Sequence, residues 1–233
     1  LQMLYWTIIF PKHLIDLKIT ELFMNTILLV ILSSSVLILF AFISNFGNRV
    51  TKSKFLNFLS TFSICGYAIP GIILAVAYIS FISWFDNSIA TFFKIKTIKS
   101  IFIGSVIGLV FVYFVRFYSL ASNGIKSAYL KINYSIDESS YLLGHSKLKT
   151  FLNIHVPYLK NSVLLIGILI AIEIIKELPI TLILRPFNFE TFATQAYIFA
   201  SQDLLEAAAA PSLFLIIIAS LFILTTYRYI LKD

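Results

Sequence analysis

The chain has 233 residues, of which 59% are hydrophobic and 12% are charged, and its mean hydropathy is +0.93. Soluble domains carry about 25% charged residues, so this composition excludes a soluble domain and predicts an all-α protein of the lipid bilayer. The net charge of +7 fits Lys and Arg collected on the inner side of a membrane. We recognise no nucleic-acid-binding module and expect no nucleic acid partner.

The chain opens on an apolar run, LQMLYWTIIF, with no charged segment or cleavage site before it. We interpret this run as the stub of an earlier helix, left at a cut end. A span needs about 20 apolar residues, and the first is expected at Met24–Ser44 inside a charge-free interval. The serines Ser33, Ser34 and Ser35 predict a close helix contact there rather than a polar path.

The second span is expected within residues 55–85, an interval that contains the sequence GYAIPG. Gly66, Pro70 and Gly71 predict a break there that kinks or opens the helix. The third span is expected at about Ser100–Leu120. Arg116 would lie near the end of that span, where its side chain could reach the membrane surface.

The fourth span, expected at Ser162–Leu184, contains Glu173, Lys176 and Glu177. Residues three and four positions apart share one face of a helix, so Lys176 can pair with Glu173 while Glu177 leaves a net negative charge. A charge at bilayer depth costs about 3 kcal/mol. Such residues therefore face the inside of a helix bundle or an aqueous cavity.

Three interpretations of these charges remain open. In the first, the charged face, with Pro179 and Arg185 beyond it, lines a translocation path in which Glu177 eases the passage of a cation. In the second, the charges form a buried ion pair that fixes helix packing. In the third, the helix is shifted so that the charges lie near the outer surface.

The fifth span is expected at Ala207–Tyr227, beginning at the run Glu206-Ala-Ala-Ala.

If the loop after the first span is inside, eleven of the 18 Lys and Arg residues lie inside, which favours this orientation. The inner set comprises Arg49, Lys52, Lys54, Arg116, Lys126, Lys131, Lys147, Lys149, Lys160, Arg228 and Lys232, and the outer set comprises Lys12, Lys18, Lys94, Lys96, Lys99 and Arg185.

No cluster of metal ligands or catalytic residues is apparent. The histidines His13, His145 and His155 have no carboxylate at ligand spacing, and we interpret them as surface residues. The one cysteine, Cys65, allows no disulfide within the chain. We therefore expect no metal site, no resident cofactor and no enzymatic activity in this chain.

The long inner loop, residues 121–161, is the segment that carries most information. Ser135 and Glu138 have the spacing of a capping box, and a helix starting there would end at Gly144. A second helix is expected from Lys147 to about His155, stopped or bent at Pro157. Physical reasoning leaves two interpretations open, an amphipathic hairpin at the membrane surface or a docking element for a cytoplasmic partner.

This loop resembles a known signature. The pattern Glu138-Ser139-Ser140-x3-Gly144-x9-Ile154-x-Val156-Pro157 is similar to E-A-A-x3-G-x9-I-x-L-P of the permease subunits of ATP-binding-cassette (ABC) importers. Serines replace both alanines, and valine replaces leucine. The resemblance implies a single permease domain over residues 1–233, of type I ABC importer architecture with about five spans. It also implies that Glu138 to Gly144 form a coupling helix, which sits in a groove of the ATPase.

Three further stretches resemble the ferric-iron branch of these permeases: GYAIPG, FVRFYSLA (Phe114–Ala121) and KELPITLILRPFNFETFATQAY (Lys176–Tyr197). That likeness implies the second half of a longer two-half permease in a bacterial inner membrane. Its partners would be the other half, a separate ATPase dimer that hydrolyses ATP, a periplasmic binding protein and membrane lipid. Related permeases for thiamine, polyamines or phosphonates are the first alternative.

Two alternatives belong to other classes of protein. Glu173 and Glu177 could serve as a proton or cation relay in an ATP-independent secondary transporter or channel. The chain could also be a membrane scaffold whose inner loop recruits a partner. The loop signature argues against both.

Overall fold

The computed structural model describes residues 2–11, 17–51, 54–93 and 102–230. Every regular element in these ranges is a helix. Among the described residues, five helices are long and apolar enough to cross a membrane: Ile19–Thr51, Gly71–Phe92, Val106–Tyr129, Lys147–Ile175 and Leu205–Thr225. Large apolar side chains such as Ile31, Phe111 and Leu221 are exposed on these helices, as lipid-facing residues are. The predicted all-α membrane class is confirmed.

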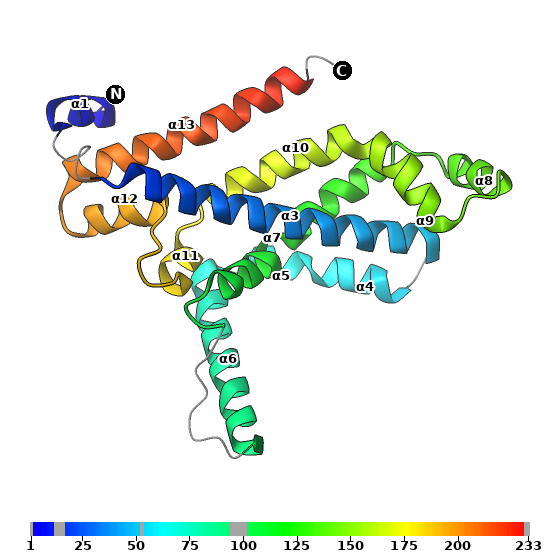
Figure 1. Ribbon diagram of the computed structural model, residues 1–233, viewed down its shortest axis with the longest axis horizontal. Coiled ribbons are helices and arrows are strands. Elements are labelled where there is room, and N and C mark those ends of the chain that lie inside the picture. The colour runs from blue at the N-terminus through cyan, green and yellow to red at the C-terminus, as the bar shows by residue number, and fades with distance from the viewer. Residues whose placement is uncertain (1, 12–16, 52–53, 94–101, 231–233) are drawn as a thin grey trace. The chain divides into compact units, whose positions relative to one another are not determined.

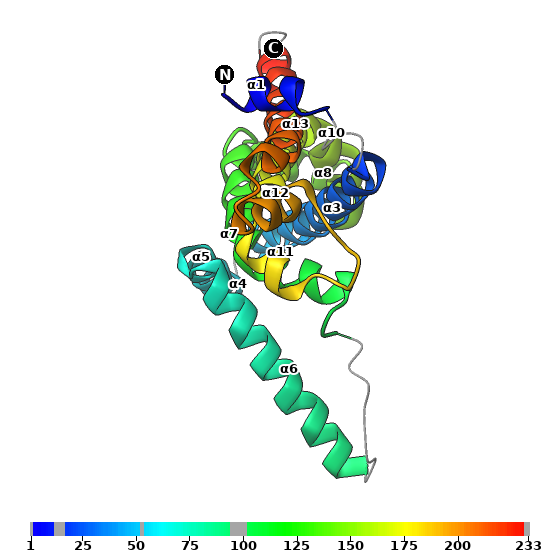
Figure 2. The same ribbon diagram turned by 90° about the vertical axis from the view of Figure 1, so that its left-hand side faces the viewer.

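The first of two compact units comprises Leu1–Ser33, Ile69–Tyr113 and Ala171–Asp233. Its elements are α1 (Gln2–Ile9), the first part of α3 (Ile19–Thr51), α6 (Gly71–Phe93), the start of α7 (Val106–Tyr129), α11 (Pro179–Leu184), α12 (Phe192–Ser201) and α13 (Leu205–Ile230). Helices α1 and α12 pack on α13, and α11 packs on α6 (Figures 1 and 2). The run Ala207–Ala210 is buried at the start of α13, which confirms that Glu206-Ala-Ala-Ala begins the fifth span.

The second unit comprises Ser34–Ala68 and Phe114–Ile170. It contains the remaining part of α3, α4 (Lys54–Phe62), α5 (Ile64–Ala68), the end of α7, α8 (Tyr134–Leu142), α9 (Lys147–Thr150), the π-helical turn η1 (Phe151–His155) and most of α10 (Val156–Ile175). Its core is formed by apolar side chains such as Leu37, Phe117, Ile125 and Leu159. Figure 1 shows α8 at the end of α3 and of the α9–α10 segment, which are the elements that position it.

The helix break near GYAIPG is confirmed. The chain leaves helical geometry at Ile69 and Pro70, and α6 begins at Gly71. The expected single span is instead divided into α4, α5 and α6, and the apolar span lies at Gly71–Phe92. Proline has no N–H to donate and is tolerated at a helix start, which explains why α6 begins directly after it.

The third and fourth spans differ from expectation in their ends. Helix α7 runs from Val106 to Tyr129, so Arg116 lies in its middle and not near its end. The fourth span begins early, because α9, η1 and α10 form one continuous helical segment across Pro157. It ends early at Ile175, because Pro179 has no N–H to donate to the carbonyl of Ile175.

A stop or a bend was expected at Pro157, and the stop is wrong for a physical reason. A proline inside a regular α-helix clashes with the carbonyl four residues earlier. Here the preceding turn is π-helical, and the Val156 N–H donates to the carbonyl of Phe151, five residues earlier. The wider turn accommodates the proline ring, and the helix continues through it.

Part of the charge count lies outside the described residues. This holds for Lys12, Lys52, Lys94, Lys96, Lys99 and Lys232, and also for His13. The inside orientation of residues 121–161 therefore remains a prediction.

Candidate functional site

The helix predicted between Ser135 and Gly144 exists as α8, a helix of nine residues outside the five spans. Its N-cap is Asn133, whose side chain accepts a hydrogen bond from the backbone N–H of Ser135 at 3.3 Å. The capping box predicted at Ser135 is therefore wrong, because asparagine caps as well as serine. Gly144, with φ of +79°, confirms the predicted glycine turn. The next helix, α9, begins after Ser146.

Helix α8 has two unlike faces. Asp137 and Ser140 are its buried side chains. Glu138 and Ser139 are exposed, and Leu142 and Leu143 at its end are 89% and 79% exposed. The helix is therefore held from one side by polar contacts and ends in two exposed apolar side chains.

The polar contacts centre on Asp137, which is 6% exposed. Its Oδ2 accepts a hydrogen bond from Arg49 Nε at 2.7 Å. Its Oδ1 lies 2.8 Å from Nε2 of His155, which is fully buried. A carboxylate paired with a guanidinium is an acceptor, so His155 Nε2 donates. His155 Nδ1 has no hydrogen-bond partner among the described residues.

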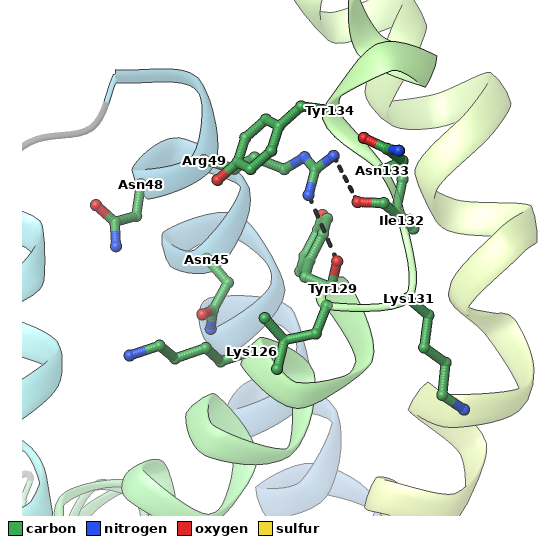
Figure 3. A pocket seen from close by; sticks show the side chains of 10 residues that line it. Asn45, Asn48, Arg49, Lys126, Tyr129, Lys131, Ile132, Asn133 and Tyr134 are labelled. Carbon is green, nitrogen blue, oxygen red and sulfur yellow. Dashed lines mark hydrogen bonds between the residues drawn. The ribbon is translucent and has the colours of Figure 1, made fainter.

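Arg49 extends the cluster to the end of α7. Its Nη2 donates to the carbonyl of Ile132 at 2.9 Å, and Nη1 donates to that of Tyr129 at 3.4 Å (Figure 3). The guanidinium also lies 4.2 Å from the ring centre of Tyr134, a favourable cation–π distance. Although Arg49 comes from the end of α3, its side chain is only 6% exposed.

An open pocket of about 570 Å³ lies beside this arginine. It is lined by Asn45, Asn48, Arg49, Lys126, Tyr129, Leu130, Lys131, Ile132, Asn133 and Tyr134 (Figure 3). The charged residues of this lining are all basic. Figure 3 shows that Lys126 and Lys131 point in different directions, so the pocket presents no convergent set of cations.

The remaining residues of the signature lie close together. Ser140 Oγ is 2.8 Å from Thr150 Oγ1 and 3.3 Å from His145 Nδ1, which ties α8 to α9. Ser139 and Ile154 line one cavity of about 290 Å³ with Ser140. Pro157 is exposed near the start of α10. Next to this cluster, burial and the carboxylate of Asp137 raise the pKa of Tyr141 above its ordinary value, although Arg49 lowers it.

Sequence reasoning missed this polar cluster. The sequence predicts no role for Asp137 and His155, and it places Arg49 among the loop charges only. The predicted surface position is wrong for His155, which is buried, whereas His145 is partly exposed. Arg49 and Asp137 lie 88 residues apart, and no helical spacing in the sequence signals that they meet.

The charged stretch of the fourth span divides into two parts. Lys176 Nζ lies 2.7 Å from Glu173 Oε1, which confirms the predicted pair. Both side chains are accessible, at 56% for Lys176 and 25% for Glu173. Glu177 is instead 7% exposed, and it lies beyond the end of α10 at Ile175. The three charges therefore do not share one helical face, as had been predicted.

Glu177 and the residues after it stabilise the turn into α11. Glu177 Oε1 accepts a hydrogen bond from the Ile180 N–H at 3.4 Å, and the Glu177 carbonyl accepts one from Thr181 Oγ1 at 2.7 Å. Pro179 is the first residue of α11. Arg185 follows that helix and forms an ion pair with Glu190, while burial lowers the pKa of Arg185.

The glycine of the predicted helix break has a packing role of its own. Gly66 lies inside α5, and a Cβ atom built on it would lie 2.1 Å from the carbonyl oxygen of Val115 in α7. The two backbones touch at this point, which requires a residue without a side chain.

No family model matches the sequence, and a search of curated proteins found no match. The fold is similar to two solved structures. One is a bacterial ABC transporter involved in the import of the acidic polysaccharide alginate, with a TM-score of 0.73, 16% identity and coverage of 93% of this chain and 82% of that one. The other is a bacterial alginate ABC transporter in complex with an alginate pentasaccharide-bound periplasmic protein, with a TM-score of 0.74, 16% identity and coverage of 93% and 80%. The chain therefore has the helical membrane fold found in ABC importers.

Proposed function

We propose that this chain is a membrane-spanning permease subunit of an ATP-driven importer and that α8 is its contact with the ATPase. The observation that carries the proposal is the form of α8. This helix lies outside the five spans, is held from one side by buried polar contacts and ends in two exposed leucines. The likeness of its sequence to the importer signature and the likeness of the fold to solved ABC importers both support this function.

The same function implies the partners. The chain would work in a bacterial inner membrane with a second permease half, an ATPase dimer that hydrolyses the ATP and a periplasmic binding protein that delivers the substrate. One of the similar structures includes a periplasmic protein, which supports the last of these. In this proposal, the chain itself holds no cofactor.

As substrate we propose ferric iron, on the resemblance of Lys176–Tyr197 to the iron branch. Among the described residues, no three His, Cys, Asp or Glu side chains gather closely enough to hold a metal ion. The accessible pair Glu173–Lys176 is the part of the charged stretch that best fits a path wall. Thiamine, polyamines, phosphonates and acidic oligosaccharides are the other substrates to test.

The docking role of α8 can be tested by placing a charge at its tip. We expect Leu142→Glu to reduce copurification of the ATPase with the tagged full-length permease about tenfold, the effect of about 1.4 kcal/mol. The reason is that a carboxylate would have to be desolvated in an apolar groove. ATP-dependent uptake in vesicles should fall with it, while the amount of permease in the membrane stays the same.

Leu130→Glu is the matched control. Leu130 is 84% exposed on the connection between α7 and α8, so the same substitution is made at a similar exposure outside α8. The control should retain the ATPase. Equal retention by both variants would show that the α8 tip is not the contact.

A further inference from the structure

The connections of α8 raise the question of how it could transmit a force. It is joined to α7 by non-helical residues 130–133 and to α9 by residues 143–146, which include the glycine turn. Short non-helical connections can bend when a force acts on them. If the ATPase displaces α8, the displacement must therefore reach the membrane spans through side-chain contacts. The buried side chains of α8 are Asp137 and Ser140.

Two other elements reach the carboxylate of Asp137. Arg49 reaches it from the end of α3, and His155 reaches it from η1, which continues directly into α10. Arg49 also holds the carbonyls of Tyr129 and Ile132 at the end of α7. The inner ends of the first, third and fourth spans therefore meet α8 at this point.

The charged groups of the cluster all have partners, which restrains their movement. Each carboxylate oxygen of Asp137 has a partner, and each of the three guanidinium nitrogens of Arg49 has one. A buried charge that loses its partner is strongly unfavourable. Sliding α8 along α3 would break several of these contacts together. A movement in which α8, the end of α3 and η1 shift together, without changing their relative positions, keeps the contacts and is favoured. Phe46 of α3 packs edge-on against the His155 ring, with ring centroids 5.3 Å apart, and further restricts the movement of the imidazole.

We propose that Arg49, Asp137 and His155 are positioning residues that form a rigid joint between α8 and the inner ends of α3 and α10. Through this joint a displacement of α8 reaches both spans. The inference rests on the proposed importer function and adds to it the residues that transmit the movement.

The test uses the complete transporter reconstituted in vesicles, with Cys65 replaced by serine. Spin labels on Thr51→Cys, at the end of α3, and Ser135→Cys, in α8, report the distance between the two helices. Both positions are exposed. We expect one narrow distance distribution that is the same without nucleotide and in the ATP-bound state. A wild-type distance that changes between the two states would overturn the joint.

Two variants remove the joint. Arg49→Met leaves the Asp137 carboxylate buried without its main partner, so this variant can fail to fold. The double variant Arg49→Met with Asp137→Asn removes both charges and keeps an amide oxygen that can accept the hydrogen bond of His155 Nε2, so it avoids that outcome. In either variant that assembles, we expect the label distance to broaden and the substrate imported per ATP hydrolysed to fall about tenfold. Lys131→Met is the control, because it removes an exposed neighbouring cation outside the joint, and it should behave like the wild type.

The outcomes separate the two proposals. A double variant with the wild-type distance and the wild-type ratio of import to hydrolysis would overturn the joint and leave the importer standing. Absence of ATP-dependent uptake in the wild type itself, with the partners present, would instead overturn the proposed function.

Discussion

At the residue scale, two buried carboxylates are stabilised in different ways. Asp137 is paired with a guanidinium and an imidazole from distant elements. Glu177 accepts a backbone N–H at the first turn of α11, where the helix dipole favours a negative charge. The first arrangement links elements together, whereas the second serves the local turn. The two residues should therefore respond differently to removal of their charge.

We expect Glu177→Gln to retain both stability and uptake, because the amide oxygen can still accept the Ile180 N–H. Glu177→Leu should lower the free energy of unfolding by about 1–3 kcal/mol, the cost of a buried donor left without a partner. Thermal unfolding of the purified protein and uptake in vesicles are the measurements, with Glu206→Gln as the control. A stable Glu177→Gln variant that has lost uptake would contradict this and would assign the carboxylate charge a role in the path.

The residues that sequence could predict are those with local partners. The Glu173–Lys176 pair follows from helical spacing, and the glycine turn at Gly144 follows from the preference of glycine for positive φ. The contact between Arg49 and Asp137 depends on how α3 and α8 come together in three dimensions. A single sequence carries no signal for that, and the burial of His155 follows from the same contact.

At the element scale, glycines set how closely the helices of the second unit approach. At Gly66 in α5, a backbone carbonyl of α7 occupies the space that an added Cβ atom would need. At Gly124 in α7, an added Cβ would instead meet side-chain atoms of Ile166, the nearest at 2.9 Å. The side chain of Ile166 can shift by a few tenths of an ångström, whereas a backbone carbonyl can move only with its helix.

We expect Gly66→Ala to lower the free energy of unfolding by about 1–3 kcal/mol, because α5 must move away from α7. Gly124→Ala is the matched substitution and should change stability by less than about 1 kcal/mol, since alanine also favours the helix over glycine. Thermal unfolding of the purified variants in detergent compares the two. Equal losses of unfolding free energy, or a larger loss for Gly124→Ala, would mean that the backbone contact at Gly66 does not determine how closely α5 and α7 approach.

The existence of the helices was more predictable than their ends. Apolar length alone locates five spans, because a membrane imposes that length. The ends depend on finer geometry. The π-helical turn before Pro157 lets the fourth span begin at Lys147, and the missing N–H of Pro179 ends it at Ile175. Neither effect appears in a hydrophobicity pattern.

At the scale of the whole molecule, composition predicts a membrane protein and the fold agrees with that of solved ABC importers. The fold alone does not identify the solute that crosses. The similar structures belong to alginate transporters, whereas the stretch Lys176–Tyr197 resembles the ferric-iron branch. Substrate and energy source must therefore be measured together.

The most direct test is uptake by the protein with its own ATPase and binding protein in sealed vesicles, with and without ATP. Ferric iron, a polyamine, thiamine and an alginate oligosaccharide would be offered in parallel. We expect accumulation of ferric iron that requires ATP. ATP-dependent accumulation of another solute instead would retain the importer and reject iron as the substrate. Flux that persists without ATP would contradict the central claim that α8 couples this membrane domain to an ATPase.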